Sequence, residues 1–323
     1  MSGVRASAPG KLVLSGEYAV LDGAPAVCMA INRRAKVKVT AVDGQRHRVS
    51  APGHSSLEGR FVVDGSAIAW LQGEDEYRIV DAVWRAVAPV PVHCLSIELD
   101  TRAFVDEASG KKIGIGSSAA LTVALAAALT QSGAVLEPAL HAHRFFQGGT
   151  GSGVDIATSI SGGLIEYRRN GAAVSPLNWP TGLAYRLVWT GVPASTRVQL
   201  DKLEKRGHGA SRAALFDAAE NMASAWRSAA AVMGQYPAYI AALQQFSVDH
   251  DLGIFDAGHE QLVSAAAAAG LVYKPCGAGG GDVGILLGNG DEQLDDFMNG
   301  RKGPGCQILD FELEPDGVLL EQS

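Results

Sequence analysis

Three short glycine runs, each beside an apolar segment, constrain this 323-residue chain more than any other feature. They lie at 110–116, 148–153 and 277–284, and no internal repeat of solenoid length accompanies them. Because glycine lacks a Cβ atom, it takes backbone conformations closed to other residues and lets a ligand lie against the main chain. We therefore expect ligands to bind at these three places.

Outside the glycine runs, the sequence predicts both strands and helices. Short β-branched or alternating segments predict strands at 11–15, 36–42, 95–99, 185–190 and 283–287. Helical patterns cover 66–88, 117–131, 138–147, 212–233 and 259–269. Because strands and helices are interleaved without a regular repeat, we expect an α+β protein of two lobes. The loop 171–182 is rich in turn formers, so we expect lobes at 1–180 and 181–323.

Composition narrows the class of protein further. The formal net charge is −7, and the basic residues are scattered, so nucleic acid and anionic membranes are not expected partners. The longest apolar run, Ala119–Leu129, is too short to span a bilayer. We expect a cytoplasmic protein that acts on a small molecule as a monomer or homodimer. Neither a zinc site nor a disulfide framework is indicated by the four widely separated cysteines Cys28, Cys94, Cys276 and Cys306.

The segment KKIGIGSSAALTVALAAAL places two glycines and two hydroxyls directly before the strongest helical pattern. N–H groups in the first turn of a helix have no intrahelical partner and point outward with the positive end of the dipole, which favours anions. Ser117 and Ser118 add hydroxyls for phosphate or magnesium. A Rossmann site needs a strand running into the first glycine, whereas the polar DEASGKK precedes it, and no Walker A pattern occurs. The segment therefore predicts another type of phosphate site.

A lysine and a carboxylate near the other loops suit phosphoryl transfer. Such a reaction needs one group to orient or deprotonate the attacking oxygen and another to neutralise charge on the transferred group. Asp155, in GSGVDIATS, and Lys11, in APGKLVLSGEY, are the candidates for these two tasks. On local sequence alone, a lysine like Lys11 is more often a solvated residue at the start of a strand.

Three segments resemble, in order and spacing, the signature motifs of the GHMP kinases: APGKLVLSGEYAVLDGAPAV, IGIGSSAALTVA and KPCGAGGGDVGI. The resemblance extends over most of the chain. It implies an N-terminal lobe like domain 2 of ribosomal protein S5, a C-terminal lobe with a ferredoxin-like core, and an active site between them. It also implies ATP and Mg²⁺ as cofactors, with Lys11 and Asp155 as catalytic residues.

The resemblance also implies which residues hold the ligands. Ser118 is the implied magnesium ligand. The second motif would wrap the ATP phosphates with Gly114, Ile115, Gly116, Ser117, Ser118 and Ala119. The third motif would support the nucleotide and substrate pocket with Gly277, Ala278, Gly279 and Gly280.

Finer features resemble the phosphomevalonate kinases within the family. Glu17 and Tyr18 follow Gly16, where mevalonate kinases carry G-E-H, and His143 stands where they carry a magnesium-ligating glutamate. The segments AHRFFQGGTGSGVDIATSISGG and VWTGVPASTRVQL also resemble that branch, which implies phosphorylated mevalonate as the substrate. The implied substrate contacts are Glu17, Tyr18, His143, Ser152, Gly153, Ser195, Thr196 and Arg197. Lys111 and Lys202 are further candidates for its anionic groups, and His143 is equally consistent with a structural histidine.

Several activities remain open at this stage. A phosphate acceptor needs no general base at neutral pH, so Asp155 would position Lys11 and the substrate. In a mevalonate kinase or another alcohol-directed member, Asp155 would instead accept a proton. A diphosphomevalonate decarboxylase fits less well, because its serine and glycine motifs differ. A non-catalytic ligand-binding member of the fold is a further alternative, although Lys11, Ser118 and Asp155 are all present.

Overall fold

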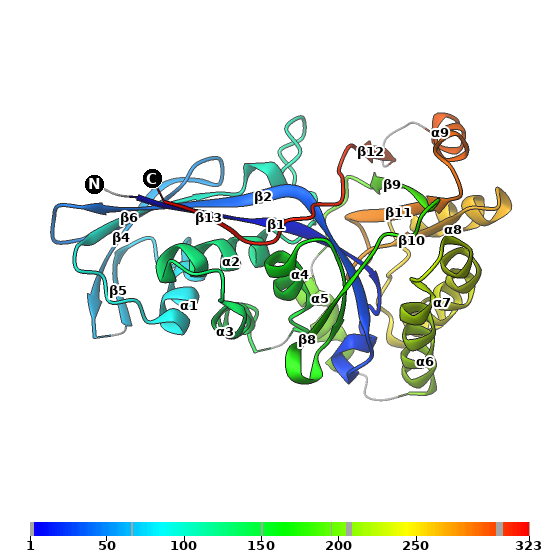
Figure 1. Ribbon diagram of the computed structural model, residues 1–323, viewed down its shortest axis with the longest axis horizontal. Coiled ribbons are helices and arrows are strands. Elements are labelled where there is room, and N and C mark those ends of the chain that lie inside the picture. The colour runs from blue at the N-terminus through cyan, green and yellow to red at the C-terminus, as the bar shows by residue number, and fades with distance from the viewer. Residues whose placement is uncertain are drawn as a thin grey trace.

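Two β-sheets organise the chain, one toward each end of the molecule in the view of Figure 1. The structure is a computed structural model that describes residues 3–65, 67–149, 151–194, 196–204, 209–301 and 306–322. The two ends of the chain lie side by side, because the last strand pairs antiparallel with the first. The larger sheet thus contains both the beginning and the end of the described chain.

The larger sheet has the order β13-β1-β2-β6-β3-β4-β5. β2 is long enough to pair with β6 at one end and with β7 at the other, and β8 pairs with β7. Only the β3–β6 pairing is parallel among the described strands of this sheet. Its strands are β1 (Gly3–Ser15), β2 (Ala26–Val42), β3 (His47–Ala51), β4 (Ser55–Asp64), β5 (Ala67–Gln72), β6 (Cys94–Asp100), β7 (Leu164–Arg168), β8 (Ala173–Leu177) and β13 (Leu319–Gln322).

Four helices lie on one side of the larger sheet (Figure 1). They are α1 (Arg78–Val87), α2 (Ser117–Thr130), α3 (Leu136–Phe146) and α4 (Val154–Ser161). α2 consists mostly of Ala, Leu and Val and is apolar on all sides, so it is buried between the sheet and the other three helices. The short 3-10 helices are η1 (Ala19–Asp22), η2 (Arg102–Phe104) and η3 (Asn170–Ala172).

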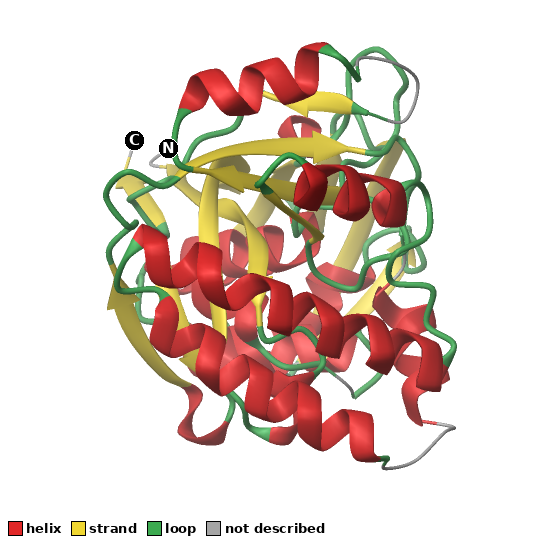
Figure 2. Ribbon diagram, turned by 90° about the vertical axis from the view of Figure 1, so that its right-hand side faces the viewer, coloured by secondary structure: helices red, strands yellow, loops and turns green. Residues whose placement is uncertain are grey.

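The smaller sheet is antiparallel, with the order β10-β11-β9-β12. Its strands are β9 (Ala184–Trp189), β10 (Val272–Pro275), β11 (Val283–Gly288) and β12 (Gln307–Leu309). Helices α6 and α7 pack against each other in this half of the molecule, and Figure 2 shows the helices from that side. The helices of this half are α5 (Thr196–Glu204), α6 (Ala210–Ala225), α7 (Ala229–His250), α8 (His259–Ala268) and α9 (Asp291–Asn299).

The structure confirms the α+β class and the five predicted strands. The helices predicted at 117–131, 138–147 and 259–269 are confirmed within a few residues. The helix predicted over 66–88 is wrong in its first half, because Ala67–Gln72 form β5, which pairs with β4, and Gly73 turns the chain with a φ of +91°. The helical pattern begins only at Arg78.

Two further expectations differ from the structure. The single helix predicted over 212–233 is two helices, since Ser228 caps α7 by accepting a hydrogen bond from the N–H of Ala231 at 3.3 Å. The predicted loop 171–182 contains β8. The division of the chain into 1–180 and 181–323 stays a prediction, and β13 joins the larger sheet although it falls in the second range.

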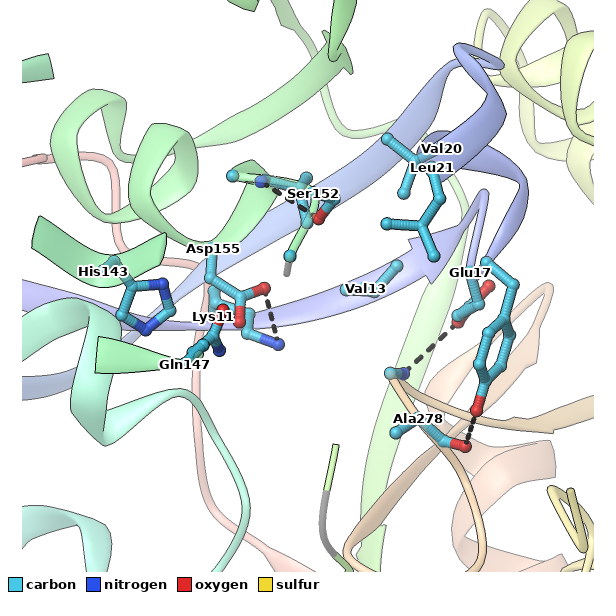
Figure 3. Close-up of a pocket in the computed structure, with 15 residues that line it drawn as sticks. Lys11, Val13, Glu17, Val20, Leu21, His143, Gln147, Ser152, Asp155 and Ala278 are labelled. Carbon is cyan, nitrogen blue, oxygen red and sulfur yellow. Dashed lines mark hydrogen bonds and ion pairs between the residues drawn. The ribbon is translucent and has the colours of Figure 1, made fainter. Parts of the chain in front are cut away.

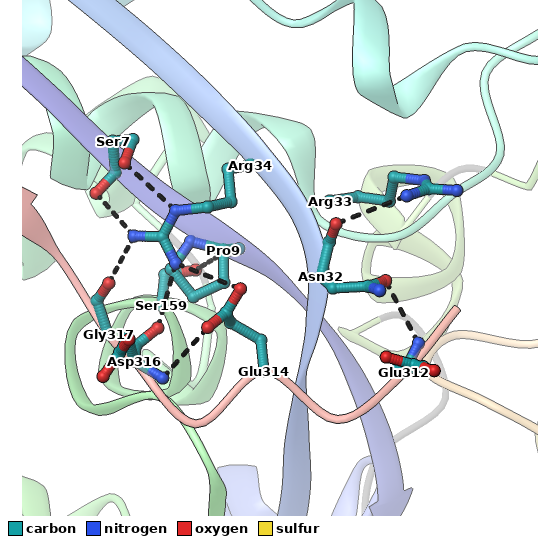
Figure 4. A network of polar contacts seen from close by, with 10 residues as sticks. All are labelled: Ser7, Pro9, Asn32, Arg33, Arg34, Ser159, Glu312, Glu314, Asp316 and Gly317. Carbon is teal, nitrogen blue, oxygen red and sulfur yellow. Dashed lines mark hydrogen bonds and ion pairs between the residues drawn. The ribbon is translucent and has the colours of Figure 1, made fainter. Parts of the chain in front are cut away.

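A strap formed by residues 310–318 carries the chain back from β12 to the larger sheet (Figure 4). The guanidinium of Arg34 on β2 donates to the carbonyl oxygens of Asp316 and Gly317, at 3.0 and 2.5 Å. It also donates to the hydroxyl and the carbonyl of Ser7 on β1, both at 3.0 Å. Burial lowers the pKa of Arg34, an effect that Glu314 opposes. Arg34 therefore joins three segments in one largely buried contact.

Replacing Arg34 with Ala should lower the free energy of unfolding by about 2–3 kcal/mol, because several partly buried acceptors lose a charged donor. Arg33→Ala is the matched control: Arg33 makes longer bonds, of 3.4 and 3.5 Å, and lies over the ring of Phe311. That control should lose about 1 kcal/mol or less. Urea denaturation of both variants measures the difference, and equal losses would contradict the importance of the strap contact.

Candidate active site

The ammonium group of Lys11 lies 2.9 Å from Oδ1 of Asp155. β1 supplies Lys11, and the first turn of α4 supplies Asp155 (Figure 3). Burial alone would lower the pKa of Lys11, but the carboxylate of Asp155 outweighs it, and the pKa is raised. Lys11 is therefore a buried, charged lysine and not a solvated residue at a strand start.

Two glycines of the second motif make room for charged side chains. Gly116 has a φ of +82°, and a Cβ atom there would lie 3.0 Å from Cε of Lys11. Gly114 has a φ of +87°, and a Cβ atom there would collide with the carboxyl group of Asp282. The N–H of Lys11 donates to the carbonyl of Ile115 at 2.9 Å. The loop that precedes α2 is thus fitted closely around Lys11 and Asp282.

His143, on α3, is buried beside these groups. Its Nε2 lies 3.2 Å from Oγ of Ser118, in the first turn of α2. Burial lowers the pKa of His143, while Asp155 opposes and Lys11 reinforces this shift. The imidazole is therefore neutral at pH 7, and it brings Ser118 toward the Lys11–Asp155 pair without adding charge.

Glu17 and Tyr18 connect the first motif with the third. The hydroxyl of Tyr18 donates to the carbonyl of Ala278 at 2.6 Å, and the N–H of Gly277 lies 3.4 Å from Oε1 of Glu17 (Figure 3). Glu17 also forms an ion pair of 2.5 Å with Lys274, which is completely buried. The structure therefore brings segments from both halves of the chain to one place.

Lys11 and Asp155 line one pocket together with His143, Glu17 and Tyr18, and we call it the first pocket. It is lined by Lys11, Val13, Glu17, Tyr18, Val20, Leu21, His143, Gln147, Gly151, Ser152, Gly153, Val154, Asp155, Gly277 and Ala278. A second pocket includes Ser117 and Ser118 at the start of α2. It is lined by Ala51, Gly53, His54, Asp75, Glu76, Tyr77, Arg78, Ile79, Leu99, Thr101, Arg102, Phe104, Val105, Lys112, Ser117, Ser118, Leu121 and Phe146. The start of α2 therefore borders the second pocket, while the Lys11–Asp155 pair lines the first.

Some predicted residues lie outside the first pocket. The side chains of Ile115 and Ala119 are buried in the core, so only their main chains remain available. Gly279 packs on Ile254, and the N–H of Gly280 donates to the carbonyl of Ile254 at 2.8 Å. Ser195 lies outside the described residues, as do the side chains of Thr196 and Arg197.

The two exposed lysines proposed for the anionic groups also lie elsewhere. Nζ of Lys111 donates to the carbonyl of Gly191 at 3.0 Å, and Nζ of Lys202 to that of Asp251 at 3.2 Å. Neither lysine lines the first or the second pocket. Their predicted contacts with a substrate stay predictions.

Asp282 is a charged group at this site that the sequence reading did not single out. Its Oδ1 accepts a hydrogen bond from the N–H of Ala194 at 3.0 Å, and the carboxyl group faces Gly114. Burial raises its pKa to about 6, although the bond from Ala194 and the charge of Lys11 oppose this. The only sequence signal was its place within the third glycine run. Strongly shifted carboxyl groups of this kind cluster at functional sites.

No group of three or more His, Cys, Asp or Glu side chains suited to a metal ion occurs in the ranges given above. Every helix in the same ranges is too short or too polar to cross a membrane.

No family model matches this chain. Comparison with individual proteins gives similar kinases. The phosphomevalonate kinase of Streptomyces sp. (strain CL190) is 30% identical over 366 aligned positions, covering 95% of this chain and 96% of the relative. The mevalonate kinase of Bos taurus is 28% identical and covers 87% and 85%. The structure of Streptococcus pneumoniae phosphomevalonate kinase in complex with phosphomevalonate and AMPPNP has a TM-score of 0.78 at 19% identity, covering 95% and 99%.

The fold and these relatives define a phosphotransferase of two lobes that acts on small molecules. The chain belongs to the GHMP kinase family, among its members of the mevalonate pathway. The predicted resemblance and the predicted GHMP fold are thereby confirmed. The roles assigned to individual residues stay predictions.

The raised pKa of Asp282 predicts how stability depends on pH. The folded state holds the proton more tightly than the unfolded chain, so the contribution of Asp282 is fully present below about pH 4 and is lost as pH rises through about 6. Asp282→Asn keeps the acceptor for Ala194 and carries no charge. It should therefore be more stable than the unsubstituted chain by about 1–3 kcal/mol near pH 7.5, with a gap that narrows toward about pH 4. Urea denaturation at several pH values tests this, and a gap independent of pH would refute it.

Proposed function

We propose that this chain transfers the γ-phosphoryl group of ATP to the phosphate of 5-phosphomevalonate, giving 5-diphosphomevalonate and ADP. The observation that carries the proposal is the ion pair between Lys11 and Asp155 at 2.9 Å. The carboxylate of Asp155 is already engaged by the ammonium of Lys11, which suits a positioning role. An acceptor that is already an anion needs no base, whereas an alcohol does.

The chemistry requires positioning and charge neutralisation. An oxygen of the acceptor phosphate bonds to the γ-phosphorus, while the bond to the β,γ-bridging oxygen breaks and its electron pair leaves with ADP. Lys11 would lie between the two phosphates and offset their charge, and burial makes this interaction stronger than in water. Asp155 would fix the ammonium in place.

The nucleotide would lie across the start of α2. Its phosphates would contact Gly114, Gly116 and the first-turn N–H groups, with the acceptor in the first pocket. Partly exposed apolar side chains of the second pocket, Leu121 and Phe146, suit the apolar faces of a nucleoside. The solved Streptococcus pneumoniae enzyme, which holds phosphomevalonate and AMPPNP, supports this combination of ligands.

Magnesium, when bound, neutralises charge on the phosphates. Among the described residues, Ser118 offers a hydroxyl at the start of α2, while Asp155 is already paired with Lys11. His143, a neutral imidazole, suits magnesium poorly. We therefore expect the phosphate oxygens to hold most of the coordination shell, with Ser118 as the protein ligand.

The identity of the acceptor is tested directly by ADP release with magnesium and ATP. With 5-phosphomevalonate and mevalonate compared at equal concentrations, 5-phosphomevalonate should be preferred by about a hundredfold or more in kcat/KM, since the site must desolvate and hold its phosphate. A preference for mevalonate would overturn the proposal and return Asp155 to a general-base role. No ADP release with either acceptor would favour a different acceptor or a binding function.

Lys11→Met should lower kcat by about a thousandfold, because the charge on the transferred group is no longer offset. Binding of AMPPNP, measured by calorimetry, should change by about threefold or less, since main-chain N–H groups hold the phosphates. Lys38→Met is the matched control, because Lys38 is an exposed lysine on β2. A Lys11→Met variant with unchanged kcat would exclude the assigned role.

A further inference from the structure

The carboxylate of Glu17 is surrounded by donors from the other half of the chain. Its Oε1 lies 2.5 Å from Nζ of Lys274 on β10, and its Oε2 accepts a hydrogen bond of 2.5 Å from the hydroxyl of Tyr239 on α7. The same hydroxyl accepts a hydrogen bond of 2.7 Å from the N–H of Gly16. Lys274 also lies 3.5 Å from the carbonyl of Val13.

All three side chains are buried. Glu17 is 4% exposed, and Lys274 and Tyr239 are 0% exposed. Removing two charges from water costs free energy that their attraction regains only with good geometry and further hydrogen bonds. A well-packed apolar pair of the same volume is often as stable. Stability alone therefore does not explain a charged pair at this position.

The pair lies directly behind the wall of the first pocket. Glu17 lines this pocket, and so do Gly277 and Ala278, which follow Lys274 by three and four residues. Glu17 contacts Lys274, and the next residue, Tyr18, donates a hydrogen bond to the carbonyl of Ala278. Two successive residues of the first motif therefore contact the third motif before Cys276 and after Gly277. None of these residues lines the second pocket.

We infer that Glu17, Lys274 and Tyr239 are positioning residues that hold the Gly277–Ala278 main chain against Lys11 and Asp155, in the pocket for the acceptor. This inference rests on the proposed function for its assignment of the first pocket to the acceptor. Glu17 has both oxygens engaged within the protein, so it acts through the loop and does not bind the substrate itself. Displacement of a substrate-holding wall by about 1 Å can cost a hundredfold in rate.

The first test separates positioning from stability. Glu17→Gln and Lys274→Met should each destabilise the fold, because one buried charge is left unpaired. The double variant should recover most of the lost melting temperature, since no charge remains unpaired. Its kcat/KM for the acceptor should nevertheless stay about a hundredfold low, with AMPPNP affinity unchanged. A double variant that recovers both stability and kcat/KM would overturn the inference.

The second test uses two tyrosines on one helix and remains informative if the single charge variants do not fold. Tyr239→Phe removes the hydroxyl that contacts Glu17 and should lower kcat/KM for the acceptor about tenfold. Tyr236→Phe is the control: its hydroxyl is equally buried and donates to the carbonyl of Leu14 at 2.9 Å rather than to Glu17. Equal losses in both variants would contradict the inference.

Both tests use whichever acceptor the unsubstituted enzyme prefers, and that measurement comes first. A preference for mevalonate would refute the proposed function but leave the positioning inference open to the same comparison. Retained turnover in the double variant and in Tyr239→Phe would refute positioning, whichever acceptor is preferred.

Discussion

The ion pair between Lys11 and Asp155 fixes how the surrounding elements must meet. A buried lysine tends to lose its charge, and here the carboxylate of Asp155 prevents this. Asp155 can reach Lys11 because α4 begins one residue earlier, with Gly153 in the left-handed conformation. Gly116, also left-handed, leaves space for the lysine side chain at the start of α2. The position of the Lys11 ammonium group therefore depends on three features together. These are the pairing of β1 with β2, the start of α2 and the start of α4.

Several charged groups at this site oppose stability. Burial raises the pKa of Asp282, so its ionised form costs free energy in the folded state at neutral pH. Glu17 and Lys274 carry a desolvation cost that an apolar pair would avoid. Both features contact glycine motifs. Such costs are typical where a protein holds charges for ligands and not for folding alone.

Local sequence was sufficient to predict those parts of the site that depend on neighbouring residues in the chain. Glycines before an apolar helix indicated the start of α2, and the family resemblance paired Lys11 with Asp155. Lys274 and Tyr239 could not be found in this way, because their contacts with Glu17 span 257 and 222 residues. The second half of α7 was missed for a different reason: Gly234 and Pro237 lie within it, and tertiary packing overrides their low helix propensity.

The first pocket has little excess positive charge to attract an anionic acceptor. Lys11 is balanced by Asp155, and Glu17 by Lys274. α4 nevertheless begins at its edge after the left-handed Gly153, and α2 begins at the second pocket after the left-handed Gly116. First-turn N–H groups and the positive ends of the helix dipoles favour phosphate without adding a titratable group. Under the proposed function, such main-chain donors would hold the phosphates in a chain whose formal net charge is −7.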